Sequence, residues 1–396
     1  MNLLAGYRVL DFGRFIAGPY CATLLGDLGA DVVRIERVEG GEDRYVLPAV
    51  PSGEGGMFLQ MNRNKRCLTL DIASAAGRDI VKKMIQTADV VVANLPRQTL
   101  KQLGLDFDSV HALNPRTVVV TVNAYGNTGP LADALGFDGV GQAMSGAMAM
   151  TGEPDAPRRA VTTYIDFSTA QACAMGALAA LWARDKAGAA GQGQLVEGSL
   201  LRSAVIQTNG MLIEQNNLQR NRIPQGTRGF GSAPSDAFKT LNGWVLVQTI
   251  GHAMFGRWCK LVGQPALVDD PRFATDELRG NNSHLISDLM GAWCATRTRE
   301  DVLAQLEKTK LPGGPVYSLQ EALDDPQIEA AGLLTPRAYA GQDDAFLLTP
   351  HPVEMSGIST TLRRAPPQLG EHTDEVLKEL GFDAAKIAEL RAQRVV

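Results

Sequence analysis

The alternation of short apolar runs with helical patterns over residues 7–122 constrains the fold most strongly. The apolar runs are rich in β-branched residues and end in polar residues, as buried strands do. Strand-like runs cover 9–12, 31–36, 89–94 and 117–122, and helical patterns cover 20–28 and 73–87. Nearly continuous apolar strands joined by helices are typical of a parallel sheet covered on both faces. The sequence therefore predicts an α/β fold with a large Rossmann-like domain.

A change of composition and sequence pattern near residue 220 predicts a second, smaller domain. A long helix at 168–186, a strand at 194–199 and a helix at 200–216 complete the first region. The stretch 219–234 is then basic and glycine-rich, as in an exposed loop or linker, and one strand and several helices follow it. We expect a large domain over 1–219, a small α+β domain with its linker over 220–330, and a C-terminal segment over 331–396.

Composition excludes several classes of protein. The chain has 396 residues, of which 45% are hydrophobic and 20% charged, and a formal net charge of −5. Such a chain has a core to bury and no overall positive field to attract nucleic acid or an anionic membrane. The longest apolar stretch, 170–183, is shorter than a membrane span, and the N-terminus lacks the pattern of a signal peptide. Neither nucleic acid nor a membrane is expected as a partner.

Cysteine and histidine spacing gives no sign of a metal site. Five cysteines are widely scattered without a CxxC pair, which favours free thiols in a reducing, cytoplasmic compartment. The five histidines are isolated, and neither HExxH nor GxSxG occurs. Metal-hydrolase and serine-triad mechanisms therefore have little support.

The turn after the first strand argues against a nucleotide cofactor of the usual kinds. Glu36 ends the second strand where a ribose-binding acid would stand. Residues 13–18, however, form neither GxGxxG nor a GxxxxGK[ST] loop, so NAD and NTP binding are disfavoured. The amides of this turn suit an anion or a polar ligand group, and a purely structural turn is an equal alternative.

Basic residues are frequent beside the predicted strands. In a doubly wound sheet, the loops that follow the strands form the ligand crevice, and Arg37 and Arg97 fall just past strand ends. Arginine binds phosphate bidentately, so a polyphosphate ligand fits this arrangement, whereas a solvated surface explains any one residue equally well. The residues concerned are Arg34, Arg37, Arg63, Lys65, Arg66, Arg97 and Lys101.

One carboxylate, Asp166, stands between a strand-like run and the long helix. Its most frequent role would be that of an N-terminal helix acid, which caps the helix and interacts with its dipole. The alternative is catalysis, because the same dipole would keep Asp166 ionised and able to attack an activated acyl carbon. Residue chemistry alone leaves both interpretations open.

Several segments together resemble the class III CoA-transferases, the family of formyl-CoA transferase and carnitine CoA-transferase, with α-methylacyl-CoA racemase as a relative. The matching segments are 6–36, 62–71, 88–97, 135–146, 164–172 and 191–200, so the likeness runs nearly end to end. The resemblance implies an interlaced, ring-like homodimer and a C-terminal segment that returns to the large domain. It also implies acyl-CoA and small carboxylic acids as substrates, and no metal or permanently bound cofactor.

The resemblance gives individual residues their expected roles. Asp166 matches the catalytic aspartate, which forms an acyl-aspartyl anhydride and an aspartyl-CoA thioester. Arg97 and Lys101 are added as coenzyme contacts on grounds of charge. Positions that match the family's CoA contacts are Ile16, Ala17, Arg37, Leu70, Asp71, Ile72, Ala73, Asn94, Leu95, Pro96, Gln102, Gly136, Phe137 and Asp138.

Departures from the family pattern bear on specificity. Formyl-CoA transferases carry glutamine at Ile16 and arginine at Gln102, which counts against formyl or oxalyl specificity. Phe137 stands where racemases place a histidine, and it cannot relay a proton. Three alternatives stay open: a racemase, an isomerase that shifts CoA within one molecule, and a non-catalytic CoA-binding protein.

The glycine-rich loop is a further candidate for substrate binding. Family members carry a glycine loop over the site, and this chain has only a partial analogue of it. Arg222 or Arg228 of this loop would suit an acceptor carboxylate, but a solvated linker is the favoured interpretation. The glycines concerned are Gly226, Gly229 and Gly231.

Overall fold

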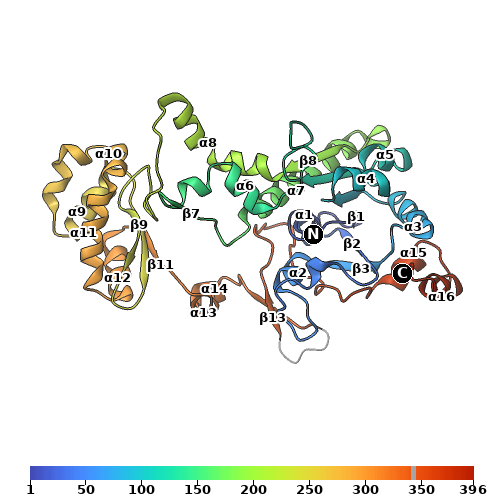
Figure 1. Cartoon of the computed structure of the whole chain (residues 1–396). Helices are drawn as coiled ribbons and strands as arrows, with labels where there is room; N and C mark the ends of the chain where they lie inside the picture. Colours follow the sequence, from blue (N-terminus) through green and yellow to red (C-terminus); the bar gives the residue numbers. More distant parts are fainter. Residues whose placement is uncertain (340–344) are drawn as a thin grey trace. The chain divides into compact units, whose positions relative to one another are not determined.

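The computed structural model describes residues 1–339 and 345–396, which divide into two compact units. The large unit comprises residues 1–147, 160–220 and 332–396. The small unit comprises residues 148–159 and 221–331. Figure 1 shows the elements of both units, and each unit is described by itself below.

The large unit is built on a six-stranded parallel sheet, which confirms the predicted α/β fold. Its strand order is β3-β2-β1-β4-β5-β8, so the direction of winding reverses between β1 and β4. In such sheets, ligands bind at this reversal, beyond the carboxyl ends of the strands. The strands are β1 Arg8–Asp11, β2 Asp31–Glu36, β3 Lys65–Thr69, β4 Val90–Ala93, β5 Val118–Asn123 and β8 Leu195–Ser199.

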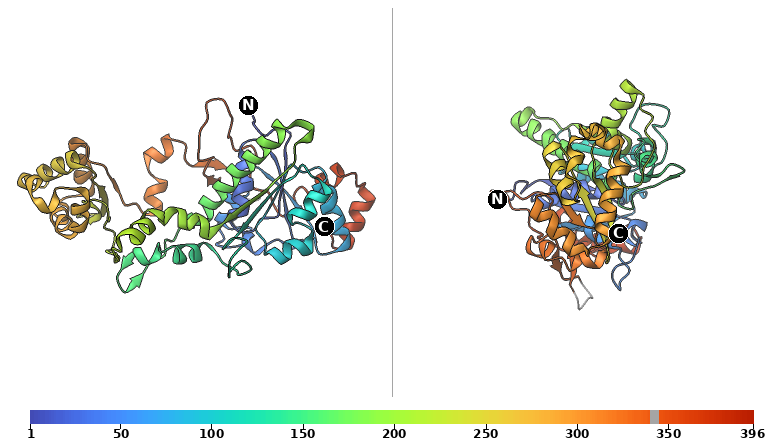
Figure 2. Two further views of the ribbon diagram at one scale, coloured as in Figure 1. Left: turned by 90° about the horizontal axis from the view of Figure 1, so that it is seen from above. Right: turned by 90° about the vertical axis from the view of Figure 1, so that its left-hand side faces the viewer.

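Helices cover both faces of this sheet (Figure 2). Neighbouring residues of one strand enter opposite cores: Val9 packs with α1 and α7, and Leu10 packs with α3 and α16. This explains the continuous apolar runs in the sequence. The helices of the large unit are α1 Ala17–Asp27, α2 Gly56–Met61, α3 Ala75–Ile85, α4 Arg97–Leu103, α5 Phe107–Leu113, α6 Asp138–Met144, α7 Tyr164–Lys186, α8 Leu200–Leu218, α15 Thr373–Glu379 and α16 Ala384–Ala392.

The small unit packs helices against a three-stranded antiparallel sheet of order β11-β10-β9. Its core contains the buried rings of Phe255 and Trp258, whose centroids lie 5.3 Å apart. Its elements are β6 Gly152–Glu153, β7 Ala156–Pro157, β9 Ser235–Lys239, β10 Trp244–Gln248, α9 His252–Leu261, α10 Asp276–Asn281, α11 Ser283–Ala295, α12 Arg299–Thr309, β11 Gly313–Pro315, α13 Leu319–Leu323 and α14 Pro326–Ala330. The hairpin β12 Thr335–Arg337 and β13 Phe346–Leu348 belongs to the large unit.

The basic residues around β3 do not lie in the ligand crevice, so that prediction is wrong. Arg63 and Lys65 are fully buried at the start of the strand, and Arg66 is 4% exposed. Their physical role is charge compensation inside the unit, because each meets a carboxylate at 2.6–2.7 Å. The partners are Asp27 for Arg63, Asp11 for Lys65 and Asp31 for Arg66.

Arg34 lines the outer cavity of the crevice, as expected, but its guanidinium is already paired inside the unit. Its guanidinium is fully buried, lies 2.6 Å from Asp43 and 3.1 Å from Glu36, and donates to the Gly13 carbonyl. The acidic partner Asp43 comes from the loop after β2, which the sequence pattern did not link to Arg34. Of the basic residues expected in the crevice, Arg34, Arg37, Arg97 and Lys101 line its cavities.

Within the described ranges 1–339 and 345–396, no helix has the length and apolar character that a membrane span requires. The same ranges contain no cluster of His, Cys, Asp and Glu side chains suited to a metal ion. All five cysteines are free and buried, and burial raises the pKa of the Cys173 thiol to about 11.

Candidate active site

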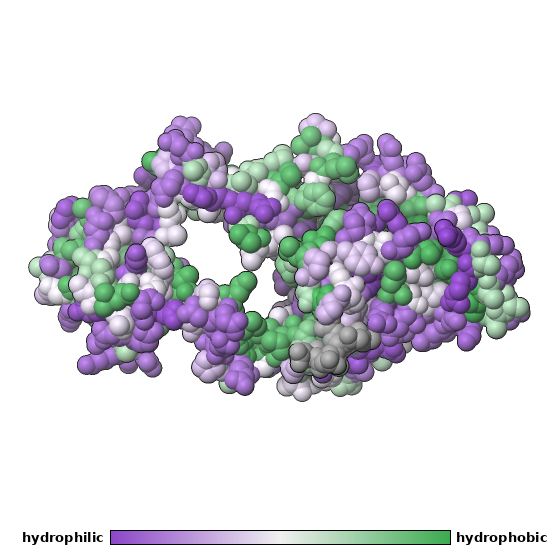
Figure 3. Space-filling view, turned by 60° about the horizontal axis from the view of Figure 1, so that its bottom comes forward, coloured by the Kyte–Doolittle hydropathy of each residue, from purple (hydrophilic) through white to green (hydrophobic). Residues whose placement is uncertain are grey.

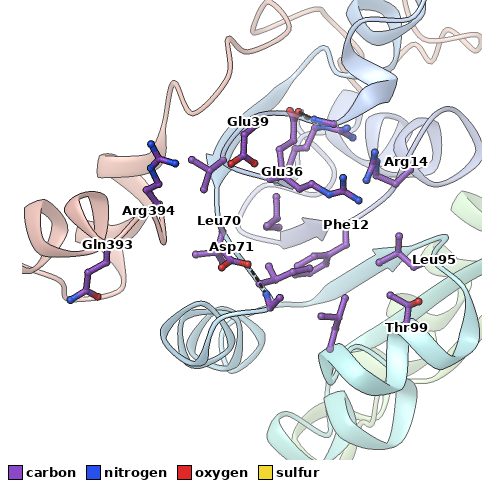
Figure 4. Close-up of a pocket in the computed structure, with 18 residues that line it drawn as sticks. Phe12, Arg14, Glu36, Glu39, Leu70, Asp71, Leu95, Thr99, Gln393 and Arg394 are labelled. Atoms are coloured by element: carbon purple, nitrogen blue, oxygen red, sulfur yellow. Dashed lines mark hydrogen bonds and ion pairs between the residues drawn. The ribbon is translucent and has the colours of Figure 1, made fainter.

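Two adjoining cavities lie beyond the carboxyl ends of β1, β2, β3 and β4. The inner cavity has a volume of 460 Å³ and the outer cavity 550 Å³. Both are lined by Arg14, Arg37, Leu95 and Thr99, so they lie side by side and share a wall. Figure 4 shows the outer cavity, with Phe12 and Leu70 in its wall. The crevice therefore stands where the sheet topology predicts it.

The structure brings most of the predicted site residues into these cavities. A third cavity of 270 Å³ is lined by Arg97, Lys101, Leu95 and Pro96. The inner cavity is lined by Ile16, Ala17, Arg37, Asn94, Leu95, Pro96, Gly136, Phe137 and Asp166. The outer cavity is lined by Arg37, Leu70, Asp71, Ile72, Ala73 and Leu95. Gln102 is exposed on α4, and neither it nor the buried Asp138 lines any of these three cavities.

Asp166 is the third residue of α7, which begins four residues earlier than predicted. Tyr164 and Ile165 resemble strand residues in sequence, and the preceding Thr163 makes no side-chain cap. The cap comes instead from Asp138, whose Oδ2 accepts the amides of Ile165 at 2.8 Å and of Asp166 at 3.1 Å. A residue 28 positions upstream thus fixes the start of this helix.

Asp138 is itself held in place by Gln142. The Gln142 amide donates to Oδ1 of Asp138, and its Oε1 accepts the backbone N–H of Ala160 at 2.9 Å. Asp138 is only 3% exposed. It therefore supports the first turn of α7 from behind and does not face the cavity that Asp166 lines.

The proton affinity of Asp166 is higher than the sequence predicted. Burial, together with the nearby carboxylate of Asp138, raises the pKa of Asp166 from its usual 3.8 to about 7. The helix dipole was expected to keep Asp166 ionised, but Asp138 occupies the first amides of α7 and places a second negative charge there. The side chain thus changes charge near neutral pH.

Asn94 ties together the loops on the two sides of the topological reversal. Its Oδ1 accepts the Arg14 amide at 2.6 Å, and its Nδ2 donates to the Arg14 carbonyl at 2.8 Å. The Gly13 amide donates to Asp11 and the Phe15 amide to Asp43. Three of the amides that the sequence offered to an anion are therefore occupied. The amides of Ile16 and Ala17 have no acceptor within the described parts of the chain.

The inner cavity has an aromatic edge. The rings of Phe15 and Phe137 meet edge to face with centroids 5.6 Å apart, and Phe137 is 64% exposed. Phe15 adopts a left-handed backbone with φ 60°, which places it at this turn. Phenylalanine has no proton to exchange, so the position that racemases use for a base is inert here.

Sequence reasoning did not single out several lining residues. Arg14 lines both cavities, and its position just after the first strand was the available signal. Gln393 and Arg394 also line the outer cavity, although they lie at least 290 residues from the other lining residues. Arg222 and Arg228 belong to the small unit, where the Arg222 guanidinium lies 5.3 Å from the Phe230 ring.

Comparison with known proteins decides the family. The family model described as CoA-transferase family III matches residues 4–373. The chain belongs to CoA-transferase family III. This family III CoA-transferase is 32% identical to the succinyl-CoA–D-citramalate CoA-transferase of Chloroflexus aurantiacus, over 98% of this chain and 97% of the relative. It is 33% identical to the succinate–glutarate CoA-transferase of Agrobacterium fabrum, over 95% of each chain.

The fold of this family III CoA-transferase also matches a solved structure. A CAIB/BAIF family protein from Brucella suis superposes with a TM-score of 0.82 and 28% sequence identity, over 95% of this chain and 98% of that one. The likeness therefore extends over both units of the chain.

Proposed function

We propose that this chain moves CoA from an acyl-CoA donor to a free carboxylic acid, with Asp166 as the nucleophile. One observation carries the proposal: a carboxylate with a pKa of about 7 lines a cavity that adjoins a larger one. Carboxylates act as covalent nucleophiles toward activated acyl groups. Membership in CoA-transferase family III supports the same reaction.

The proposed reaction proceeds through covalent aspartyl intermediates. Ionised Asp166 attacks the thioester carbonyl and the C–S bond breaks. CoA departs as the thiolate, and the acyl group stays on Asp166 as an acyl-aspartyl anhydride. The thiolate then attacks the aspartyl carbonyl, which releases the donor acid and forms an aspartyl-CoA thioester. The acceptor carboxylate then attacks the aspartyl-CoA thioester and releases CoA thiolate, which leaves an anhydride between Asp166 and the acceptor. The thiolate attacks the acceptor's acyl carbon of this anhydride, which forms the new acyl-CoA and frees the Asp166 carboxylate. Each step exchanges one acyl bond for another and needs no redox cofactor.

The two cavities suggest how the coenzyme lies. We place the nucleotide end in the outer cavity, beside Arg37 and the loop 70–73, and the thioester end in the inner cavity, beside Asp166. The Arg37 side chain is 67% exposed, and its one ion-pair partner among the described residues is Glu42, at 3.9 Å, which leaves it available to a phosphate.

Succinyl-CoA is the donor we propose to test first. Both relatives described above are named for succinyl-CoA or succinate, and the same is true of the succinyl-CoA:glutarate CoA-transferase of Homo sapiens, which is 30% identical. A matrix of dicarboxylic acids as acceptors would identify the substrate pair. Transfer without any second acid would show an intramolecular shift instead.

The decisive experiment compares Asp166→Ala with Asp185→Asn. Asp185 is a second acid on α7 that lines none of the three cavities. With succinyl-CoA and the acid panel, we expect Asp166→Ala to lose at least a thousandfold in rate, since removing a covalent nucleophile costs about that much or more. Asp185→Asn should keep nearly full activity. Mass spectrometry of the wild-type chain incubated with donor should detect the CoA adduct on Asp166. Undiminished exchange by Asp166→Ala would end the assignment.

We also propose that the active form is an interlaced homodimer. Large apolar side chains are exposed along α7 and α8, and hydrophobic patches interrupt the hydrophilic surface (Figure 3). Exposed apolar patches of this kind mark interaction surfaces. The residues concerned are Met175, Trp182, Ile206, Met211, Leu212, Ile213 and Leu218.

A further inference from the structure

The segment 393–396 folds back against the loop that follows β3. Helix α16 ends at Ala392, and Val395 and Val396 are buried in the core beneath the sheet. The Val395 carbonyl accepts the backbone N–H of Asp71 at 2.8 Å. The segment is thus attached both by apolar packing and by a backbone hydrogen bond to the loop 70–73.

This attachment places Arg394 at the edge of the outer cavity. Its backbone is left-handed, with φ 55°, a conformation that is unfavourable for a non-glycine residue and persists where the surrounding structure holds it. Figure 4 shows Arg394 on a separate segment, across the cavity from Leu95 and Thr99. Its guanidinium has no carboxylate partner among residues 1–339 and 345–396.

Some of the other arginines of the outer cavity are paired with carboxylates, and some are available to a ligand. Arg14 is held by Asp43 at 2.9 Å and by Glu42, and the buried Arg34 is held by Asp43 and Glu36. Arg37 and Arg394 remain available to a ligand, while the carboxylates of Glu39 and Asp71 line the same cavity. A ligand group here must therefore be anionic and must reach the two arginines selectively. Phosphate meets that requirement, because a guanidinium binds it through two parallel hydrogen bonds.

We propose that Arg394 binds a phosphate of the nucleotide end of CoA, opposite Arg37. This inference rests on the proposed function. CoA carries two kinds of phosphate, the 3′-phosphate of the ribose and the diphosphate, and their shared chemistry is what Arg394 recognises. Binding through the segment 393–396 adds one side of the groove to the coenzyme site.

The test is calorimetric titration of CoA and of 3′-dephospho-CoA into full-length protein. The variant is Arg394→Gln, and the matched control is Arg391→Gln. Arg391 lies on α16, pairs with Asp374 at 2.6 Å and lines none of the described cavities. Arg394 is exposed, and its anchoring bond belongs to the backbone of Val395, so both variants should unfold at nearly the wild-type temperature.

We expect Arg394→Gln to weaken CoA binding roughly tenfold, as loss of one charge-assisted hydrogen bond does. Arg394→Lys should restore much of the affinity. A loss confined to CoA identifies the 3′-phosphate as the partner, and an equal loss for both ligands identifies the diphosphate. CoA affinity equal to that of Arg391→Gln would overturn the inference. Failure of the wild-type protein to bind CoA at all would instead refute the proposed function.

Discussion

At the scale of single residues, the site depends on two carboxylates that lie close together and face different surroundings. Asp138 is buried and accepts two backbone amides, whereas Asp166 lines the cavity. Burial raises the pKa of Asp166, and the negative charge of Asp138 raises it further, because two neighbouring carboxylates repel each other when both are ionised. The charged groups that line the inner cavity with Asp166 are Arg14, Arg37 and Glu42.

This arrangement predicts the pH dependence of the transfer rate. The nucleophile must be ionised, so the rate should rise between pH 6 and pH 8, with a midpoint set by a pKa of about 7. Asp138→Asn removes the neighbouring charge and should move the midpoint to lower pH. Steady-state rates with saturating substrates from pH 5 to pH 9 measure both profiles. A flat profile for the wild-type enzyme would contradict the prediction.

The same pKa predicts a pH-dependent gain in stability for Asp166→Asn. The folded pKa is raised above the unfolded value of 3.8, so the ionised side chain disfavours the folded state. The resulting loss of folding stability begins as pH rises above about 4 and is complete above about 7. Asp166→Asn should therefore raise the unfolding temperature more at pH 8 than at pH 5. Thermal unfolding at the two pH values tests this, and an equal or reversed difference would count against it.

At the scale of elements, β3 contains charged side chains that are buried in the interior of the large unit. Lys65 is fully buried and donates to Asp11 at 2.7 Å, to the Pro19 carbonyl at 2.8 Å and to Asn62 at 3.1 Å. These three acceptors satisfy the whole ammonium group. The basic run in the sequence is therefore part of the support beneath the first turn of the crevice.

We predict that Lys65→Met destabilises the fold by about 3–5 kcal/mol. The change removes the ion-pair partner of the buried Asp11 carboxylate at 2.7 Å and leaves it the more distant Arg34 guanidinium, at 3.8 Å. Urea denaturation measures the effect. The control is Lys82→Met on α3, where the exposed lysine pairs with the exposed Asp79 at 2.9 Å, and there the change should stay within about 0.5 kcal/mol. Similar costs for the two variants would show that the buried pair is unimportant.

Elements with apolar periodicity could be predicted from sequence, and those fixed by distant partners could not. Strand β2 covers the predicted residues 31–36 because its apolar run ends in polar residues. Strand β3 has the sequence KRCLT, which is not typical of a buried strand. Its basic side chains are buried because Asp11 of β1 and Asp31 of β2 pair with them, and the local sequence does not show these partners. The start of α7 depends on Asp138, and the edge of the outer cavity on Arg394, which no local pattern connects to the site. Residues just past strand ends, such as Arg37, were predictable because parallel strands end together.

At the scale of the whole molecule, the apolar faces of α7 and α8 predict self-association. Trp182 is 67% exposed and Ile206 is 70% exposed, and both belong to the large unit. If these faces meet a second copy, light scattering should give twice the mass of one chain. Trp182→Glu or Ile206→Glu should shift the mass toward one chain, because each buries an unpaired charge. Leu241→Glu, at an exposed position of the small unit, serves as a control. A wild-type mass of one chain at micromolar concentration would exclude the dimer.

The paired hydrogen bonds between Asn94 and the main chain of Arg14 have a consequence for affinity. They imitate one rung of a β-ladder in a place where the strands have already ended, so the floor of the crevice is rigid before any coenzyme arrives. An incoming CoA then meets loops that are preorganised, and little binding free energy is lost to ordering them.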